Sequence, residues 1–185
     1  MALPQPFTPI HYIPPSQKPQ ILSSPLLSLQ AIAHTSPPTN PTTNHWSLYV
    51  TTPSSLINID CLPSYTYPSP NLRGGSKANL IISALSALPE DAIKIYTLCV
   101  AENRNLTVGD VLDVIVRNGR EKYEFNEMGT GCRMWVRDQL RLLLEEGVLV
   151  DKDEVEGVVE GAILRLWPSG EGLEIDEGGY YGEGG

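Results

Sequence analysis

Apolar and polar residues alternate along two neighbouring segments in the first third of the chain. In residues 45–52, HWSLYVTT, and 56–61, LINIDC, apolar side chains recur at every second position. This alternation, together with many β-branched and aromatic residues, is typical of strands that bury one face. A turn on Pro53–Ser54 makes the two segments a hairpin. It pairs the apolar residues with one another, Val50 with Ile57, Leu48 with Ile59 and Trp46 with Cys61. A slip by one residue would mix the two faces, so this register is favoured.

Three further segments are predicted to be strands. Residues 26–35, 78–88 and 92–101 are apolar runs bounded by proline, glycine and serine. The intervening residues 62–77, rich in the same three residue types, are predicted to form a long connection.

The second half of the chain shows helical spacing instead. After Thr107, a good N-cap residue with Asp110 three positions on, apolar residues recur at helical intervals until Gly119. A second helix is predicted over residues 132–146 and a third, more acidic one over 154–166. Because strands precede helices, we predict an α+β fold, in which an antiparallel sheet from the N-terminal half packs against two or three helices from the C-terminal half.

A chain of 185 residues is long enough for one domain with a real core. Ten of its sixteen prolines lie in residues 1–41, and residues 169–185 carry five acidic residues and no basic one. We therefore expect a proline-rich disordered arm over residues 1–20, one α+β domain over 21–168 and an acidic, Gly/Glu-rich disordered tail over 169–185.

The charge distribution excludes several classes of partner. The net charge is −9, and no stretch forms a basic stripe, which argues against nucleic acid and against an anionic membrane surface as partners. No apolar run approaches the ~18 residues of a membrane span, and the N-terminus lacks the features of a signal peptide. The expected partner is a small-molecule substrate, while the sequence sets no oligomeric state.

The cysteines and histidines are dispersed. Cys61, Cys99 and Cys132 have neither metal-type nor disulfide-type spacing, which indicates reduced thiols in a cytoplasmic protein. With His11, His34 and His45 equally scattered, no metal site and no cofactor are expected.

The polar face of the hairpin carries one candidate group. There Tyr49 opposes Asn58 and Ser47 opposes Asp60, with His45 diagonal to Asp60. Diagonal neighbours lie ~7–8 Å apart, so a carboxylate or amide at these positions can fix the imidazole tautomer. The alternative is that these polar side chains simply face water.

The second helix offers a candidate nucleophile. Cys132 begins it, on the stripe of Trp135, Val136, Leu140 and Leu143 that packs against the sheet. Free N–H groups and the dipole at a helix N-terminus favour a thiolate and can bind an oxyanion, while Gly129 and Gly131 permit close backbone approach. The alternative is an inert buried cysteine. On the opposite side, Arg133, Arg137 and Arg141 are predicted to form an exposed ladder.

A glycine-rich loop is a weaker candidate. Residues 71–80, NLRGGSKANL, bring together Arg73, Gly74, Gly75, Ser76 and Lys77, whose backbone N–H groups could hold a phosphate or carboxylate. The spacing is not that of a phosphate-binding P-loop, and a plain flexible loop is the alternative.

Two motifs together resemble a known group of enzymes. NHWSLYV at 44–50 and GCRMWV at 131–136 resemble the permuted papain-like thiol enzymes, which include the lecithin:retinol acyltransferase-like proteins. In that group a His-Trp strand precedes a helix that opens with the nucleophilic cysteine. The resemblance implies a permuted papain-like fold, with His45 as base, Cys132 as nucleophile, and Asp60 or Asn58 orienting the base where the family often has a second histidine. Gly131 stands where the family often has asparagine.

The chain as a whole resembles a family of uncharacterised fungal proteins. The shared pattern is HWSLY, GGSK, LTVGD, GRxxYEF and GCR-aromatic-W, at 45–49, 74–77, 106–110, 119–125 and 131–135. This resemblance implies an intracellular protein, sometimes met beside natural-product pathways, and brings no established reaction.

The function expected from these observations is a cysteine-dependent hydrolase or acyl-transfer enzyme acting on a small molecule in a fungal secondary-metabolite pathway. Two alternatives remain open. One is a non-catalytic binding or accessory protein on the same scaffold, and the other is a cofactor-free cyclase or isomerase.

Overall fold

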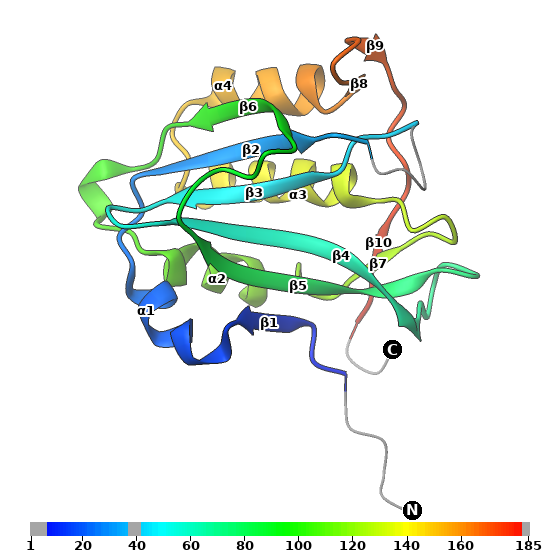
Figure 1. Cartoon of the computed structure of the whole chain (residues 1–185), viewed down its shortest axis with the longest axis horizontal. Coiled ribbons are helices and arrows are strands. Elements are labelled where there is room, and N and C mark those ends of the chain that lie inside the picture. The colour runs from blue at the N-terminus through cyan, green and yellow to red at the C-terminus, as the bar shows by residue number, and fades with distance from the viewer. Residues whose placement is uncertain (1–6, 37–41, 183–185) are drawn as a thin grey trace, which may run out of the picture.

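A large sheet forms the centre of the protein in the computed structural model, which describes residues 7–36 and 42–182. Its strand order is β10-β7-β5-β4-β3-β2-β6, and β1 pairs with the β7 side of β5 (Figure 1). Neighbouring strands are antiparallel except for β1 and β5, which are parallel. The strands of this sheet are β1 (Ile10–Ile13), β2 (Ser28–His34), β3 (Trp46–Thr51), β4 (Leu56–Pro68), β5 (Ser76–Leu85), β6 (Ala92–Leu98), β7 (Tyr123–Phe125) and β10 (Gly179–Tyr180). A separate small ribbon joins β8 (Arg165–Leu166) to β9 (Glu171–Gly172).

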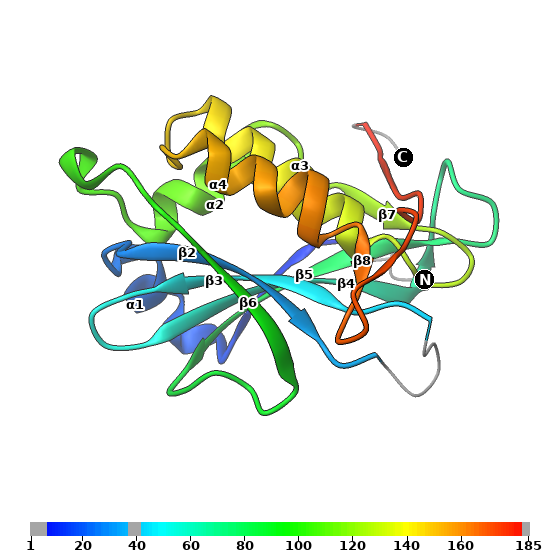
Figure 2. The ribbon, with the colours of Figure 1, turned by 90° about the horizontal axis from the view of Figure 1, so that it is seen from above.

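Helices cover one face of this sheet. Figure 2 shows α2, α3 and α4 together on that face. The helices are α1 (Lys18–Ser23), α2 (Val108–Arg117), α3 (Cys132–Glu145) and α4 (Lys152–Glu156), which continues as a π-helix over Gly157–Ala162, and short 3-10 turns occupy Pro15–Gln17 and Glu102–Arg104. The predicted α+β class, with an antiparallel sheet under helices, is therefore confirmed. Within the described part of the chain, no helix has the length and hydrophobicity that a membrane crossing requires.

The predicted hairpin register is confirmed. Leu48 pairs with Ile59 and Val50 with Ile57, and all four side chains are buried. The two polar partners, Tyr49 and Asn58, also pair as predicted. Strict alternation was enough to fix this pairing because a slipped register would expose the apolar side chains.

The first long helix begins where its cap predicts. The Thr107 hydroxyl accepts a hydrogen bond from the Asp110 N–H, and the Asp110 carboxylate accepts one from the Thr107 N–H at 2.7 Å. This reciprocal capping box satisfies two N–H groups that a helix start otherwise leaves without partners.

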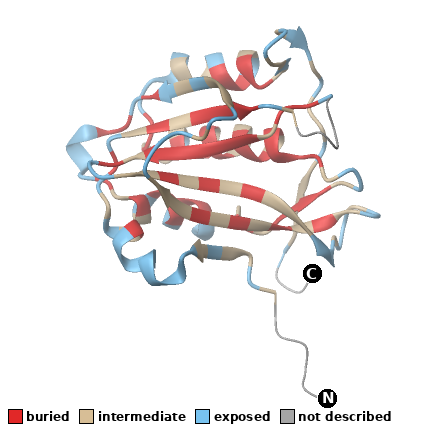
Figure 3. Ribbon diagram, in the orientation of Figure 1, coloured by how far each residue is buried: buried red, intermediate tan, exposed pale blue. Residues whose placement is uncertain are grey.

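The face of the sheet opposite the helices is partly covered as well. The connection between β5 and β6, residues 86–91, crosses it in front of β3 and β2 (Figures 1 and 2). Figure 3 accordingly shows β2 and β3 buried along most of their length, whereas β4 and β5 alternate between buried and intermediate residues. Ser47 and Tyr49, on this second face, are therefore buried rather than solvated.

The prediction of a disordered arm over residues 1–20 is wrong for its second part. Ile10 to Ile13 form β1, which pairs with residues 80–83 of β5, and α1 follows. The reason is that β7 covers only the first residues of β5, so the remaining edge is free to accept another strand. Residues 1–6 lie outside the described residues.

The C-terminal segment is ordered too, contrary to the prediction for residues 169–185. Tyr180 in β10 packs edge-on against Tyr123 at 4.9 Å between ring centroids. Its hydroxyl accepts a hydrogen bond from Gln139 Nε2 and donates one to Asp138. A half-buried tyrosine with satisfied polar atoms outweighs the acidic, glycine-rich composition around it. Residues 183–185 lie outside the described residues.

The connection predicted over residues 62–77 is shorter in the structure than in the prediction. β4 continues to Pro68 and stays paired with β5, with a shift of register between Pro63 and Pro68. Only residues 69–75 form a turn between the two strands, which places the glycine-rich loop at the tip of a second hairpin.

Candidate active site

Cys132 occupies the first position of α3, and a glycine sets the direction of that helix. Gly131, the N-cap, has φ +145°, a conformation that L side chains rarely adopt. Its carbonyl accepts a hydrogen bond from the Tyr123 hydroxyl at 2.8 Å, and a Cβ there would lie 3.2 Å from that oxygen. The glycine thus lets α3 begin in contact with β7.

His45 lies immediately before β3 and is bonded to a carboxylate of the next strand. Its Nε2 is 2.6 Å from Asp60 Oδ1, and the two side chains are 25% and 18% exposed. Asn58, the other residue predicted to orient the imidazole, has no hydrogen-bond partner for its buried Oδ1. Of the two candidates, Asp60 is therefore the one that contacts His45.

Cys132 and His45 line the same cavity of about 80 Å³. Cys132 is 9% exposed, at the edge of the core. The cavity wall is made by two short segments, one before β3 and one at the start of α3, and by single residues from β4 and the C-terminal segment. These residues are Thr43, Asn44, His45, Tyr65, Met128, Gly129, Thr130, Gly131, Cys132 and Asp176. Cys132 and His45, 87 positions apart in the sequence, are thus brought together by the fold.

The charge of His45 is set by its neighbours. Burial disfavours its imidazolium, but the Asp60 carboxylate and Cys132, each by charge and by hydrogen bonding, raise the pKa of His45 well above its ordinary value. An imidazolium beside a sulfur stabilises the thiolate, which is the nucleophilic form of cysteine.

The start of α3 also provides hydrogen-bond donors. No side chain caps this helix end. The first N–H groups of a helix have no intrahelical acceptor, so those of Cys132 and Arg133 can bind an anion. A developing oxyanion is the kind of group that such donors stabilise.

Asn44 connects the histidine segment to the C-terminal segment. It is fully buried, its Oδ1 accepts the Trp167 N–H at 2.6 Å, and its Nδ2 donates to the carbonyls of His34 and Trp167 at 2.9 and 3.0 Å. The Cys132 sulfur lies 3.9 Å from the Asn44 carbonyl oxygen. These hydrogen bonds fix the backbone of Asn44, which lies next to His45 in the sequence and next to the Cys132 sulfur in space.

A second histidine lies close to the first in space, although the three histidines are dispersed along the sequence. The ring of His34 is 5.6 Å from that of His45, and its Nε2 and Nδ1 lie 2.8 Å from Ser47 Oγ and 3.1 Å from Asp91 Oδ1. Burial lowers the pKa of His34, and the charge of His45 lowers it further. The hydrogen bond to Asp91 acts in the opposite direction but is outweighed. The two histidines meet because β2 pairs with β3. Beyond the last paired residues, the His34 N–H donates a hydrogen bond to the His45 carbonyl, and the sequence alone did not indicate this pairing.

Arg133 corrects the prediction of an exposed arginine ladder. Its side chain is 1% exposed, whereas those of Arg137 and Arg141 are 25% and 40% exposed. The Arg133 guanidinium donates to three backbone carbonyls and to the Asp176 carboxylate at 3.3 Å, the carbonyls being those of Ile163, Leu173 and Glu174. The C-terminal segment buries the Arg133 side chain, and the helical spacing of the arginines contains no information on this segment.

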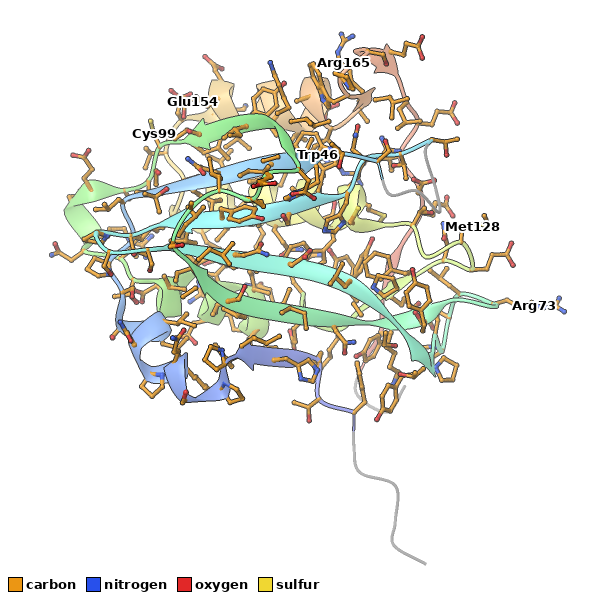
Figure 4. The ribbon with its side chains drawn as sticks, in the orientation of Figure 1. Trp46, Arg73, Cys99, Met128, Glu154 and Arg165 are labelled. Carbon is orange, nitrogen blue, oxygen red and sulfur yellow. The ribbon has the colours of Figure 1, made fainter. Side chains whose placement is uncertain are left out.

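The glycine-rich loop has a structural place at the same end of the sheet. Gly74 has φ +77°, and a Cβ on Gly75 would lie 2.1 Å from the Phe125 carbonyl, so both glycines allow the turn to meet β7. The Ser76 hydroxyl accepts the Tyr65 N–H at 3.3 Å. Lys77 Nζ lies 4.6 Å from the Tyr181 ring centroid, while the Arg73 side chain extends outward from the loop tip (Figure 4). Anion binding by this loop stays a prediction.

Among the residues described, no group of three or more histidine, cysteine, aspartate or glutamate side chains is arranged to hold a metal ion. Comparison with curated proteins and with solved structures gives no match. Residues 29–181, most of the chain, match a family described as a domain of unknown function, DUF7770. The match covers both His45 and Cys132 and agrees with the predicted uncharacterised domain family. This chain belongs to the DUF7770 family of domains of unknown function.

Proposed function

We propose that the protein is a cysteine-dependent hydrolase or acyltransferase that acts on a small molecule. The observation that carries the proposal is that Cys132 and His45 line one cavity, with His45 bonded to Asp60 on its other side. Nucleophile, base and orienting carboxylate are the three parts of a nucleophilic triad.

The proposed reaction has two steps. The Cys132 thiolate attacks the acyl carbon, an S–C bond forms, and the bond to the leaving group breaks as His45 donates its proton to that group. Water or another acceptor then attacks the thioester, His45 takes its proton, and the C–S bond breaks to return the thiolate. The N–H groups at the start of α3 hold the negative oxygen in both steps.

The relationship to permuted papain-like thiol enzymes is part of this proposal. It is supported by the order of a histidine at the start of a strand followed by a cysteine at the start of a helix. The effect of Cys132 on the pKa of His45, together with their shared cavity, adds to that support. A role in fungal secondary metabolism is the corresponding expectation for the pathway.

The small size of the cavity favours a second candidate. A cavity of about 80 Å³ beside a thiol that is only 9% exposed also suits a binding or accessory protein without covalent chemistry. A cofactor-free cyclase or isomerase would likewise use the imidazole and leave the sulfur unmodified. Both alternatives predict an unreactive Cys132.

Selective alkylation separates these possibilities. Cys99 is exposed, but its hydrogen bond to Glu154 and the charge of that carboxylate raise the pKa of the Cys99 thiol. Burial raises the pKa of Cys61 well above its ordinary value. With iodoacetamide at neutral pH, followed by peptide mass spectrometry, we expect Cys132 to react about tenfold faster than Cys99 despite its lower exposure. Faster labelling of Cys99 would contradict the proposal.

A further inference from the structure

Two large side chains are exposed at the mouth of the cavity. Tyr65 is 77% exposed and Met128 is 72% exposed, and both line the cavity that contains Cys132 and His45. Single exposed apolar residues are ordinary on a protein surface, but two beside one cavity form a local apolar rim. Met128 comes from the loop before α3, and Tyr65 from the far end of β4.

The position of Tyr65 is imposed by the backbone. Its φ is +57°, in the left-handed region that residues other than glycine rarely adopt. The residue lies within the shift of register between Pro63 and Pro68, and its N–H donates to the buried Ser76 hydroxyl. A strained residue held by a specific contact at a cavity is the arrangement found where a side chain must be placed for function.

Gly129 shows how closely the ring approaches. A Cβ at this position would lie 2.8 Å from the Tyr65 hydroxyl oxygen and 3.1 Å from its ring. The tyrosine ring therefore rests directly on the backbone of the loop that precedes Cys132. Among the twenty amino acids, glycine alone leaves room for this contact at φ +69°.

Size limits what the cavity can accept. An apolar cavity of about 150 Å³ holds a benzene ring, so a space of about 80 Å³ suits an acyl group of two or three carbons. The remainder of the substrate must extend past the rim.

We infer that Tyr65, supported by Met128, determines the specificity of the site for esters or thioesters with a short acyl group and an apolar, aromatic leaving group. The acyl group occupies the cavity next to Cys132, and the leaving group lies against the tyrosine ring and the methionine thioether. Aromatic stacking and sulfur–aromatic contacts supply the attraction. This inference rests on the proposed thiol-dependent function.

Three substrates and matched variants test it. The substrates are 4-nitrophenyl acetate, 4-nitrophenyl octanoate and S-methyl thioacetate, and the variants are Tyr65→Ala, Tyr65→Phe and Met128→Ala. We expect wild-type kcat/KM to be about tenfold lower for the octanoate than for the acetate. Tyr65→Ala should raise KM for 4-nitrophenyl acetate about fivefold. Met128→Ala should raise it less, and Tyr65→Phe, which keeps the ring, should stay within about twofold of wild type. For S-methyl thioacetate, which has no aromatic leaving group, we expect no change in KM.

Failure of this inference is distinguishable from failure of the proposed function. Turnover that requires Cys132 but is unaffected by Tyr65→Ala and Met128→Ala overturns the role of the rim and leaves the thiol chemistry intact. Turnover that persists without Cys132 overturns both. An unchanged rate of iodoacetamide labelling at Cys132 in Tyr65→Ala shows that the variant keeps the site folded, and Met128→Ala, altered at an exposed position, provides the independent second variant.

Discussion

Replacing Cys132 with alanine is expected to reduce hydrolysis of 4-nitrophenyl acetate about a thousandfold, because the proposed thioester intermediate forms on its sulfur. The wall also contains the hydroxyls of Thr43, Tyr65 and Thr130; that of Thr43 donates to the Asn44 carbonyl and that of Thr130 to the Asn126 side chain. The measurement is the initial rate of nitrophenolate release by wild type and variant at equal concentrations of folded protein.

The matched control for this experiment is Cys99→Ala. Cys99 is an exposed thiol bonded to Glu154, outside the cavity, so its removal should leave the rate unchanged. Near-normal turnover by Cys132→Ala would show that the thiol is not the nucleophile. A comparable loss in Cys99→Ala would point to surface thiol chemistry instead.

Replacing Arg133 with methionine is expected to lower the free energy of unfolding by about 3 kcal/mol. The guanidinium is almost fully buried and donates to the carbonyls of Ile163, Leu173 and Glu174. Methionine fills similar space but leaves these buried acceptors without a donor, and it releases the segment that carries Asp176 to the cavity wall. Urea denaturation followed by circular dichroism measures the change.

Arg137→Met is the control on the same helix. Arg137 is 25% exposed and pairs with the adjacent Asp138, so its loss should cost less than about 1 kcal/mol. Equal effects of the two substitutions would mean that the carbonyl contacts of Arg133 contribute nothing beyond those of an ordinary surface arginine.

Local sequence patterns predicted the parts of the fold in which the interacting residues are close together in the sequence. The hairpin register followed from alternation on β3 and β4, and the start of α2 followed from Thr107 and Asp110. The pairing of His45 with Asp60 follows from the same register, since the two residues lie diagonally at the open end of that hairpin.

The remaining features depend on segments that meet only in the folded chain. Composition marked both termini as disordered, yet β1 occupies a free edge of β5 and Tyr180 packs against Tyr123. Helix periodicity placed Arg133 outside because it contains no information on the C-terminal segment that covers it. The sequence predicts a long connection around Tyr65 because the neighbouring prolines and serines obscure the continuation of β4.

The pKa values of the two neighbouring imidazoles are shifted in opposite directions for a structural reason. His45 is bonded to Asp60 and shares its cavity with Cys132, and both groups raise its pKa despite burial. His34 is buried beside the Ser47 hydroxyl, its one carboxylate partner Asp91 is 55% exposed, and its pKa is lowered. Two positive rings 5.6 Å apart would repel one another, so the charge of His45 is one of the causes that lower the pKa of His34.

An NMR titration of His45 in wild type and in Cys132→Ala tests most directly whether His45 and Cys132 act as a pair. The ring carbon and nitrogen shifts of His45 should titrate well above about 6.5, the ordinary histidine value, and should do so at a lower pH in Cys132→Ala, because the variant lacks one of the groups that raise this pKa. His34 should titrate below its ordinary value in the wild type. If His45 instead titrates at the ordinary value, or at the same pH with and without the Cys132 sulfur, the two side chains do not interact and the proposed chemistry has no basis.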